Sequence, residues 1–229
     1  MIAKPVALHD VECGAGEPLV LLHGNGESGA YFARQMDAFA AHFHVYAVDT
    51  RGHGQSPRGE APFTLDQFVE DLKLFLDKQR IDKAHLLGFS DGGNVALLFA
   101  LRYPGRVDRL VLNGANLTPI GVKPAIQIPI AIGYGATCAL APISKTARAK
   151  KELLGLMVTQ PHIEINSLAA LRMPVLVLAG THDMIRTAHT RRIAAAIPGA
   201  KLCLLNGDHF IAAKNPDSFN RAVLDFLIN

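Results

Sequence analysis

The order of residues along this chain predicts an α/β fold with a mostly parallel, doubly wound sheet. Short apolar runs alternate with longer segments in which apolar residues recur at helical spacing. Glycine and polar residues follow most of the apolar runs, as they do where buried strands end in turns. Strands that alternate with helices form parallel sheets through right-handed crossovers, and ligands bind beyond the carboxyl ends of such strands. We therefore expect functional side chains directly after the strands.

The length and charge of the chain indicate one domain without a nucleic-acid partner. A chain of 229 residues, of which 49% are hydrophobic, can bury the core of a single α/β domain. The 23 basic and 20 acidic residues are scattered, and the net charge is only +3. This mixture provides no extended basic surface for nucleic acid.

The cysteines and the first residues indicate a cytoplasmic protein. Cys13, Cys138 and Cys203 are few, odd in number and without the paired spacing of a metal site. Sparse cysteines are typical of the reducing cytosol. Residues 1–6 lack the apolar region of a secretory signal, so they do not predict export.

The periodicity places the individual elements. We expect strands at residues 6–12, 19–22, 44–48, 84–89, 107–112, 173–179 and 201–205. We expect helices at residues 31–41, 65–76, 95–103 and 185–197, and a final helix after Asn215-Pro216. Thr64 and Gln67 have the spacing of a capping box at the start of the second of these helices.

The alternation of strands and helices stops for about fifty residues after Asn113-Gly114. Long irregular insertions in compact α/β domains are usually functional, typically as a lid. Residues 124–144 carry no charge and are long enough to span a bilayer, but their prolines and glycines are expected to break a helix. We therefore expect an apolar cover over the site and no membrane span. We predict a core domain of residues 1–114 and 169–229 with a short lid at residues 115–168.

The clearest motif is Gly88-Phe-Ser-Asp-Gly92, which joins an apolar run to a helix-like segment. A strand that reverses into a helix within one or two residues forces positive φ on the turn residue and leaves no room for side chains two positions away. Such a turn holds the Ser90 hydroxyl clear of the sheet, at a helix N-terminus that stabilises developing negative charge. Ser90 is therefore a candidate nucleophile.

The partners of a nucleophilic serine follow other predicted strands. Asp183 comes shortly after the strand at residues 173–179, and His209 follows the strand at residues 201–205. Nucleophile, acid and base thus stand in the order Ser, Asp, His. Asp208 is a poor partner for His209, because adjacent side chains diverge.

These motifs resemble those of the α/β-hydrolase superfamily over nearly the whole chain. The matching segments are His23-Gly24, Asp49-Thr-Arg-Gly-His-Gly-Gln-Ser56, Gly88-Phe-Ser-Asp-Gly-Gly93, Pro174-Val-Leu-Val-Leu-Ala-Gly180 with Asp183, and Gly207-Asp-His209. The chain departs from the family pattern in two ways, since the usual first strand is missing and the lid is short. The resemblance implies an α/β-hydrolase fold and a serine hydrolase.

In this reading Ser90 attacks an acyl carbon, His209 is the general base and Asp183 orients the imidazole. The backbone N–H groups of Asn25 and Asp91 form the oxyanion hole. His23 braces the oxyanion loop rather than acting as a base. We expect no metal ion and no organic cofactor, because no histidine or cysteine set has usable ligand spacing.

The carboxylate of Asp91 has two interpretations. An acid in the first turn of a helix is favoured by the helix dipole whatever the substrate. Within the superfamily, the segments Gly88–Gly93 and Asn113-Gly-Ala-Asn116 are most similar to the biphenyl-hydrolase-like, valacyclovir-hydrolase type. That resemblance implies that Asp91 binds a cationic group of an amino-acid ester.

The sequence is compatible with three alternative functions. The first is a cytoplasmic carboxylesterase-like hydrolase that cleaves small-molecule esters or related acyl compounds. The second keeps the same three residues but hydrolyses carbon–carbon bonds or catalyses cofactor-free perhydrolysis, which the sequence does not separate from ester cleavage. The third is a ligand receptor on the hydrolase fold, which the presence of all three residues disfavours.

Overall fold

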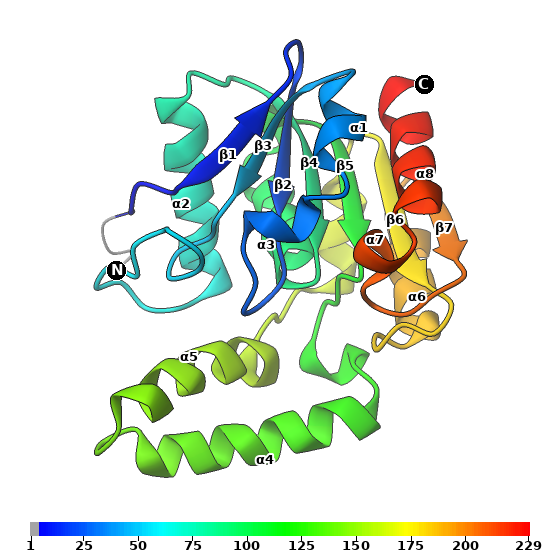
Figure 1. The fold of residues 1–229 in the computed structure, drawn as a ribbon. Helices are drawn as coiled ribbons and strands as arrows, with labels where there is room; N and C mark the ends of the chain where they lie inside the picture. Colours follow the sequence, from blue (N-terminus) through cyan, green and yellow to red (C-terminus); the bar gives the residue numbers. More distant parts are fainter. Residues whose placement is uncertain (1–4) are drawn as a thin grey trace.

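The computed structural model describes residues 5–229, which form a twisted sheet between two layers of helices (Figure 1). Within this described part the sheet has seven strands in the order β1-β3-β2-β4-β5-β6-β7. The strands are β1 (Asp10–Cys13), β2 (Pro18–Leu22), β3 (His44–Val48), β4 (Ala84–Phe89), β5 (Val107–Asn113), β6 (Val175–Gly180) and β7 (Lys201–Leu205). The edge strand β1 pairs antiparallel with β3, and all other pairs are parallel. The expected sheet is confirmed.

Helices cover both faces of this sheet. The α-helices are α1 (Met36–Ala40), α2 (Leu65–Lys78), α3 (Asp91–Arg102), α4 (Pro124–Leu140), α5 (Lys145–Thr159), α6 (Thr187–Ala196), α7 (Ile211–Lys214) and α8 (Pro216–Ile228). Short 3-10 turns occur at Gly29–Phe32, Pro104–Arg106, Pro119–Gly121 and Ile165–Ala170. Thr64 caps α2, where its hydroxyl accepts a hydrogen bond from the Gln67 N–H at 3.2 Å. The second half of the expected capping box is absent, because the Gln67 side chain turns to Asp71 instead.

Alternate strand residues pack into two hydrophobic cores, one on each face of the sheet. Val20 and Leu22 of β2 pack with α2, α3 and α6 on one face. Leu19 and Leu21 pack with α1 and α8 on the other face. Because both faces are covered, every residue of β4 is buried, which explains the continuous apolar runs.

Two elements near the N-terminus differ from expectation. The strand expected at residues 6–12 begins only at Asp10, because the N–H groups of Val6 and His9 bind the side chains of Asp71 and Ser56. The helix expected at residues 31–41 is divided into a 3-10 turn and the short α1. The division lies at the fully buried Gln35, whose amide donates to the Ala212 carbonyl at 2.9 Å.

The insertion after β5 was expected to be irregular, and this prediction is wrong. It contains α4 and α5, which pack against each other as a helical hairpin (residues 123–160) beyond the carboxyl edge of the sheet (Figure 1). α4 continues through Pro129. The missing Pro129 N–H leaves the Ala125 carbonyl without its helical partner, but Ala125 is exposed and water can hydrate that carbonyl. Gly155 lies where α5 meets Tyr134 of α4, so it permits close packing instead of breaking a helix.

The hairpin is joined to the sheet domain by polar contacts and by Leu156 of α5, which is buried in the core on the α2 and α3 side of the sheet. The Asn25 amide donates to the Leu153 carbonyl at 2.8 Å, and Arg58 forms an ion pair with Glu152. The Gln160 side chain accepts a hydrogen bond from the Leu65 N–H at 2.9 Å. None of the described helices is both long and apolar enough to cross a membrane.

Candidate active site

Ser90 lies at the sharp turn between β4 and α3 with φ 54° and ψ −119°. This conformation is strained for a residue with a side chain, and the surrounding turn maintains it. The Ser90 N–H donates to the Asn113 carbonyl of β5 at 2.8 Å, and the Ser90 carbonyl accepts from the Asn94 N–H at 3.0 Å. The turn predicted from the sequence is therefore present.

The two glycines of the motif are required by close backbone contacts. A Cβ at Gly88 would lie 2.2 Å from the Gly92 carbonyl oxygen. A Cβ at Gly92 would lie 2.1 Å from the Leu22 carbonyl oxygen of β2. Neither position can hold a side chain unless the backbone moves.

Ser90, His209 and Asp183 form one chain of hydrogen bonds. The Ser90 Oγ lies 3.0 Å from His209 Nε2, and His209 Nδ1 lies 2.7 Å from Asp183 Oδ1. The Asp183 carboxylate can only accept, so Nδ1 carries the proton and the lone pair of Nε2 faces Ser90. His209 and Asp183 are both buried, and Asp183 Oδ1 also accepts from the Ile185 N–H at 2.8 Å. The structure thus brings together three residues that are far apart in sequence.

Gly114, which the sequence reading did not select, packs directly against this chain. It has φ 64°, and a Cβ there would lie 2.8 Å from His209 Cε1 and 3.5 Å from Asp183 Oδ2. A side chain at this position would displace the imidazole. Its place directly after a strand was the signal available in the sequence.

The N–H groups of Asn25 and Asp91 are both available to a ligand. Within residues 5–229 neither group donates a hydrogen bond to a protein acceptor. Asn25 lies in the loop that follows β2, and Asp91 is the first residue of α3. The Asp91 N–H lies at the N-terminus of α3, where the helix dipole is positive.

Two histidines brace the loop that carries Asn25. His23 Nδ1 donates to the Gly24 carbonyl at 2.7 Å, so its Nε2 accepts from the Thr50 N–H at 3.0 Å. His53 Nε2 likewise accepts from the Gly26 N–H at 3.1 Å. Burial lowers the pKa of His23 to about 4 and also lowers the pKa of His53, which keeps both rings neutral at pH 7. The structure agrees with the bracing role expected for His23.

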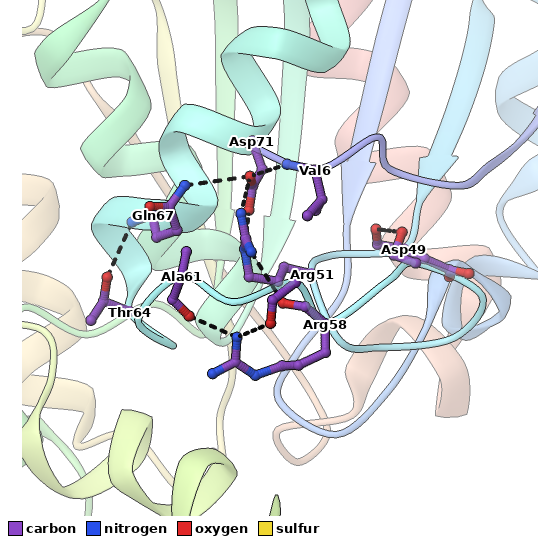
Figure 2. A network of polar contacts seen from close by, with 10 residues as sticks. Val6, Asp49, Arg51, Arg58, Ala61, Thr64, Gln67 and Asp71 are labelled. Carbon is purple, nitrogen blue, oxygen red and sulfur yellow. Dashed lines mark hydrogen bonds and ion pairs between the residues drawn. The ribbon is translucent and has the colours of Figure 1, made fainter. Parts of the chain in front are cut away.

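Arg51 is buried and holds the loop after β3 through its hydrogen bonds. Its guanidinium is fully buried and binds Asp71 of α2 at 2.6 and 2.7 Å (Figure 2). Asp71 also accepts from the Val6 N–H at 3.0 Å, and Arg51 donates to the Arg58 carbonyl at 3.1 Å. This bidentate pair joins the loop after β3 to α2 and to the N-terminal segment.

The Asp91 side chain lies beside a very small internal cavity. This cavity has a volume of about 10 Å³ and is lined by the loop that carries Asn25, by His53 and by Leu156 of α5. Asp91 Oδ2 is buried and has no hydrogen-bond partner among residues 5–229. Desolvation raises the pKa of Asp91 to about 6, although Asn25, His209 and Asn94 act in the opposite direction. A cavity of this size holds at most about one water molecule.

One cavity is lined by Ser90, and a second cavity adjoins it at His209. One, of about 100 Å³, is lined by Asn25, Glu27, Phe89, Ser90, Met157, Met184, His209 and Phe210. The other, of about 310 Å³, shares its last three residues and extends past Lys123, Ile126 and Asp208. α5 therefore covers the site through Met157, whereas most of the apolar stretch at residues 120–143 is exposed. The expectation that this stretch covers the site is largely wrong.

Glu27 is a second acid at the site that the sequence reading missed. One of its carboxylate oxygens accepts from the Gly24 N–H at 3.2 Å. Burial raises the pKa of Glu27, although Gly24 and His209 act in the opposite direction. The signal available in the sequence was an acid three residues after Gly24, within the loop that carries Asn25.

Metal ligands and paired thiols are not found in the described part of the chain. No group of three or more His, Cys, Asp or Glu residues there is placed to hold a metal ion. The three cysteines are free and half-buried.

Comparison with known proteins identifies the family. Residues 17–132 match the family model described as alpha/beta hydrolase fold. A protein of Caulobacter sp. (strain K31) named "Putative carbamate hydrolase RutD" is 29% identical, over 96% of this chain and 94% of its own length. Its alignment spans 253 positions and is longer than this chain, so the relative has segments without a counterpart here.

Solved structures agree with this result. A hydrolase from Pseudomonas aeruginosa PA01 is 30% identical with a TM-score of 0.76, over 96% of this chain and 94% of that chain. The meta-cleavage product hydrolase CumD from Pseudomonas fluorescens IP01 is 25% identical in one variant, with a TM-score of 0.78, over 99% of this chain and 96% of that chain. The family match covers half of the chain, and the sheet and its turn motifs agree with it. The chain therefore belongs to the alpha/beta hydrolase fold family, as a hydrolase.

Proposed function

We propose that the protein is a serine hydrolase that cleaves carboxylic esters or related acyl compounds through an acyl-enzyme. The observation that carries this proposal is the hydrogen-bonded chain from Ser90 Oγ through His209 to Asp183. Nε2 of His209 removes the hydroxyl proton while Oγ attacks the acyl carbon. Asp183 holds the Nδ1–H tautomer and stabilises the imidazolium that forms.

The oxyanion of the tetrahedral intermediate binds the N–H groups of Asn25 and Asp91. Both groups lack a protein acceptor among the described residues, which supports this role. His209 then protonates the leaving group, and the acyl group remains on Ser90. Water attacks the acyl-enzyme with His209 as base, which releases the acid and restores the serine.

The substrate is a small molecule with a short acyl group. The cavity beside Ser90 is about 100 Å³, well below the roughly 300–1,000 Å³ of sites for drug-sized ligands. The adjoining cavity of about 310 Å³ has room for the larger part of the substrate. The Caulobacter relative carries a carbamate hydrolase name, and a carbamate also presents an acyl carbon with a heteroatom leaving group.

In this proposal residues 115–168 are a lid on a core of residues 1–114 and 169–229. The contact of Met157 with the catalytic cavity supports this division. The free cysteines support a cytoplasmic location. No step of the mechanism requires a cofactor.

A fluorophosphonate probe tests the nucleophile. We expect labelling of the wild-type protein and none of the Ser90→Ala variant. A series of p-nitrophenyl esters from acetate to octanoate, with a methyl carbamate added, then tests the substrate class. We expect kcat/KM to fall as the acyl chain lengthens. An unlabelled but folded wild-type protein would reject the proposal.

Hydrolysis of carbon–carbon bonds is the second candidate. The 25% identical CumD variant is named a meta-cleavage product hydrolase, which favours this alternative specifically. A vinylogous diketo acid, followed by its loss of absorbance, distinguishes the two. Turnover of this substrate with no turnover of any ester would replace the first proposal by the second.

An experiment can distinguish the two interpretations of the Asp91 carboxylate. The cavity of about 10 Å³ that Asp91 lines has no room for part of a substrate, which supports a structural role. To bind an ammonium group of the substrate, the Asp91 side chain would need to turn toward Ser90. We expect Asp91→Asn to change kcat/KM equally for α-amino esters and uncharged esters. A loss confined to α-amino esters would instead support recognition of a cationic group.

A further inference from the structure

The outer face of the helical hairpin is apolar and exposed. Ten large apolar side chains are strongly exposed within the described residues, and six of them lie between residues 120 and 143. These six are Ile120, Ile126, Ile128, Ile132, Leu140 and Ile143. α4 buries none of its residues, and Ile132 and Ile143 are 69% and 84% exposed. An apolar concentration of this kind marks an interaction surface.

The outer face consists of Ile128, Ile132, Leu140 and Ile143. Ile120 precedes α4, and Ile126 instead lines the cavity beside His209. Ile128 and Ile132 are one helical turn apart, and small residues and Leu140 continue this face toward Ile143. The opposite face of α4 contacts α5, where Gln127 donates to the Met157 carbonyl at 3.0 Å. In Figure 1, α4 is the helix farthest from the sheet, and α5 lies nearer to it. The outer face therefore has no partner within the described chain.

Positively charged residues stand near both ends of α4 in the sequence. The sequence contains no Asp or Glu from Arg109 to Lys151. Lys145, Lys150 and Lys151 are exposed at the start of α5, and within residues 5–229 none of them forms an ion pair. The first acid, Glu152, is already paired with Arg58. Lys123 adds a positive charge before the other end of α4.

We propose that the hairpin docks on an anionic membrane surface, with α4 lying parallel to the bilayer. Its apolar face enters the boundary between headgroups and acyl chains, while the lysines at both ends bind anionic headgroups. A helix of 17 residues is about 25 Å long and too short to cross the hydrocarbon core of about 30 Å. A second copy of the chain is a poorer occupant, because a symmetric contact through α4 would gather lysines from both copies without any acid between them.

Docking in this way keeps the sheet domain in water beyond the hairpin. α5 then lies between the membrane and the catalytic cavity that Met157 lines. The docking itself does not depend on the reaction catalysed, so it can be tested by binding alone.

Flotation of the purified protein with lipid vesicles tests the proposal. We expect binding to vesicles that contain one third phosphatidylglycerol, weaker binding to pure phosphatidylcholine, and loss of the difference at high salt. Lys145→Gln/Lys150→Gln should weaken partitioning to the anionic vesicles about 30-fold, at about 1 kcal/mol for each lysine. Ile132→Ser/Ile143→Ser should weaken binding to both kinds of vesicle.

Matched controls lie elsewhere on the surface. Lys78→Gln removes an exposed lysine of α2, and Ile228→Ser removes an apolar side chain that is 52% exposed. Both controls should float like the wild type, and all variants should keep its Tm. Binding to neither vesicle, or equal losses in controls and hairpin variants, would overturn the proposal. A dimer in light scattering that Ile132→Ser dissociates, without vesicle binding, would assign the face to a second copy instead.

Discussion

A methyl group added at Gly92 would meet the Leu22 carbonyl oxygen at 2.1 Å, whereas one added at Gly135 in α4 would meet nothing within 4 Å. The two positions differ in how closely the surrounding chain packs against the backbone. At the carboxyl edge of the sheet, backbone packs against backbone, and one conformation is imposed on Ser90 and its neighbours. In the hairpin, two helices pack mainly on each other and join the sheet domain through Leu156 and a few polar contacts. We therefore expect a substitution at the sheet edge to disturb the fold more than one on the outer face of the hairpin.

The largest effect that tests this comparison is on catalysis at the sheet edge. We expect Asp183→Asn to lower kcat/KM by about 10³–10⁴-fold, because the amide no longer holds the correct imidazole tautomer. Asp208→Asn is the matched control. Its carboxylate binds the Phe210 N–H and Lys214, away from the His209 ring. Equal losses in the two variants would contradict the assignment of Asp183.

The next effect is on folding stability. Gly92→Ala should lower the free energy of unfolding by about 3 kcal/mol or more, because two backbone segments must separate. Gly105→Ala, where a Cβ meets nothing within 4 Å, should change it by less than about 0.5 kcal/mol. Urea unfolding measures both. A near-neutral Gly92→Ala would show that the turn is less constrained than its contacts indicate.

The third effect depends on pH and on the buried Asp91 carboxylate. Because its pKa is raised from 3.8 to about 6, the folded protein binds the proton more tightly than the unfolded chain. Stability from this group is complete below pH 4 and is lost as the pH rises through 6. Asp91→Asn, which does not titrate, should therefore gain about 1–3 kcal/mol relative to wild type between pH 4 and pH 7.5. Asp208→Asn should show no such gain, since the Lys214 hydrogen bond lowers the pKa of Asp208.

The smallest effect concerns the hairpin. Gly135→Ala should stabilise α4 by about 0.5–1 kcal/mol, because alanine is a better helix former and the site is open. Hydrogen exchange of α4 amides should slow, while exchange in β4 and β5 stays the same. A slowing that extends to the strands would mean that hairpin and sheet unfold together.

Much of the sheet and the candidate site followed from local sequence pattern. Strands buried on both faces read as apolar runs, and the turn at Ser90 needs glycines at fixed offsets, so both leave a signal in neighbouring residues. Parallel strands then place their carboxyl ends on one edge, which is why the sequence indicates Asp183 and His209 as partners of Ser90. The secondary structure expected from the sequence was wrong at Gln35 and at Pro129. The break before α1 depends on a buried contact with Ala212, and α4 continues through Pro129 because water can hydrate the exposed Ala125 carbonyl.

The residue types of the candidate site at the sheet edge were thus readable along the chain, because they follow the strand ends. The surroundings of each side chain were not, because they depend on contacts between distant segments. Only the folded chain places Asp91 at the wall of a cavity of about 10 Å³ and sets Gly114 against the His209 ring. It also places the apolar stretch after residue 120 on the outside, where the sequence suggested a cover. Hydrophobicity alone predicts that a segment avoids water, but the tertiary contacts decide whether a partner within the chain is there to cover it.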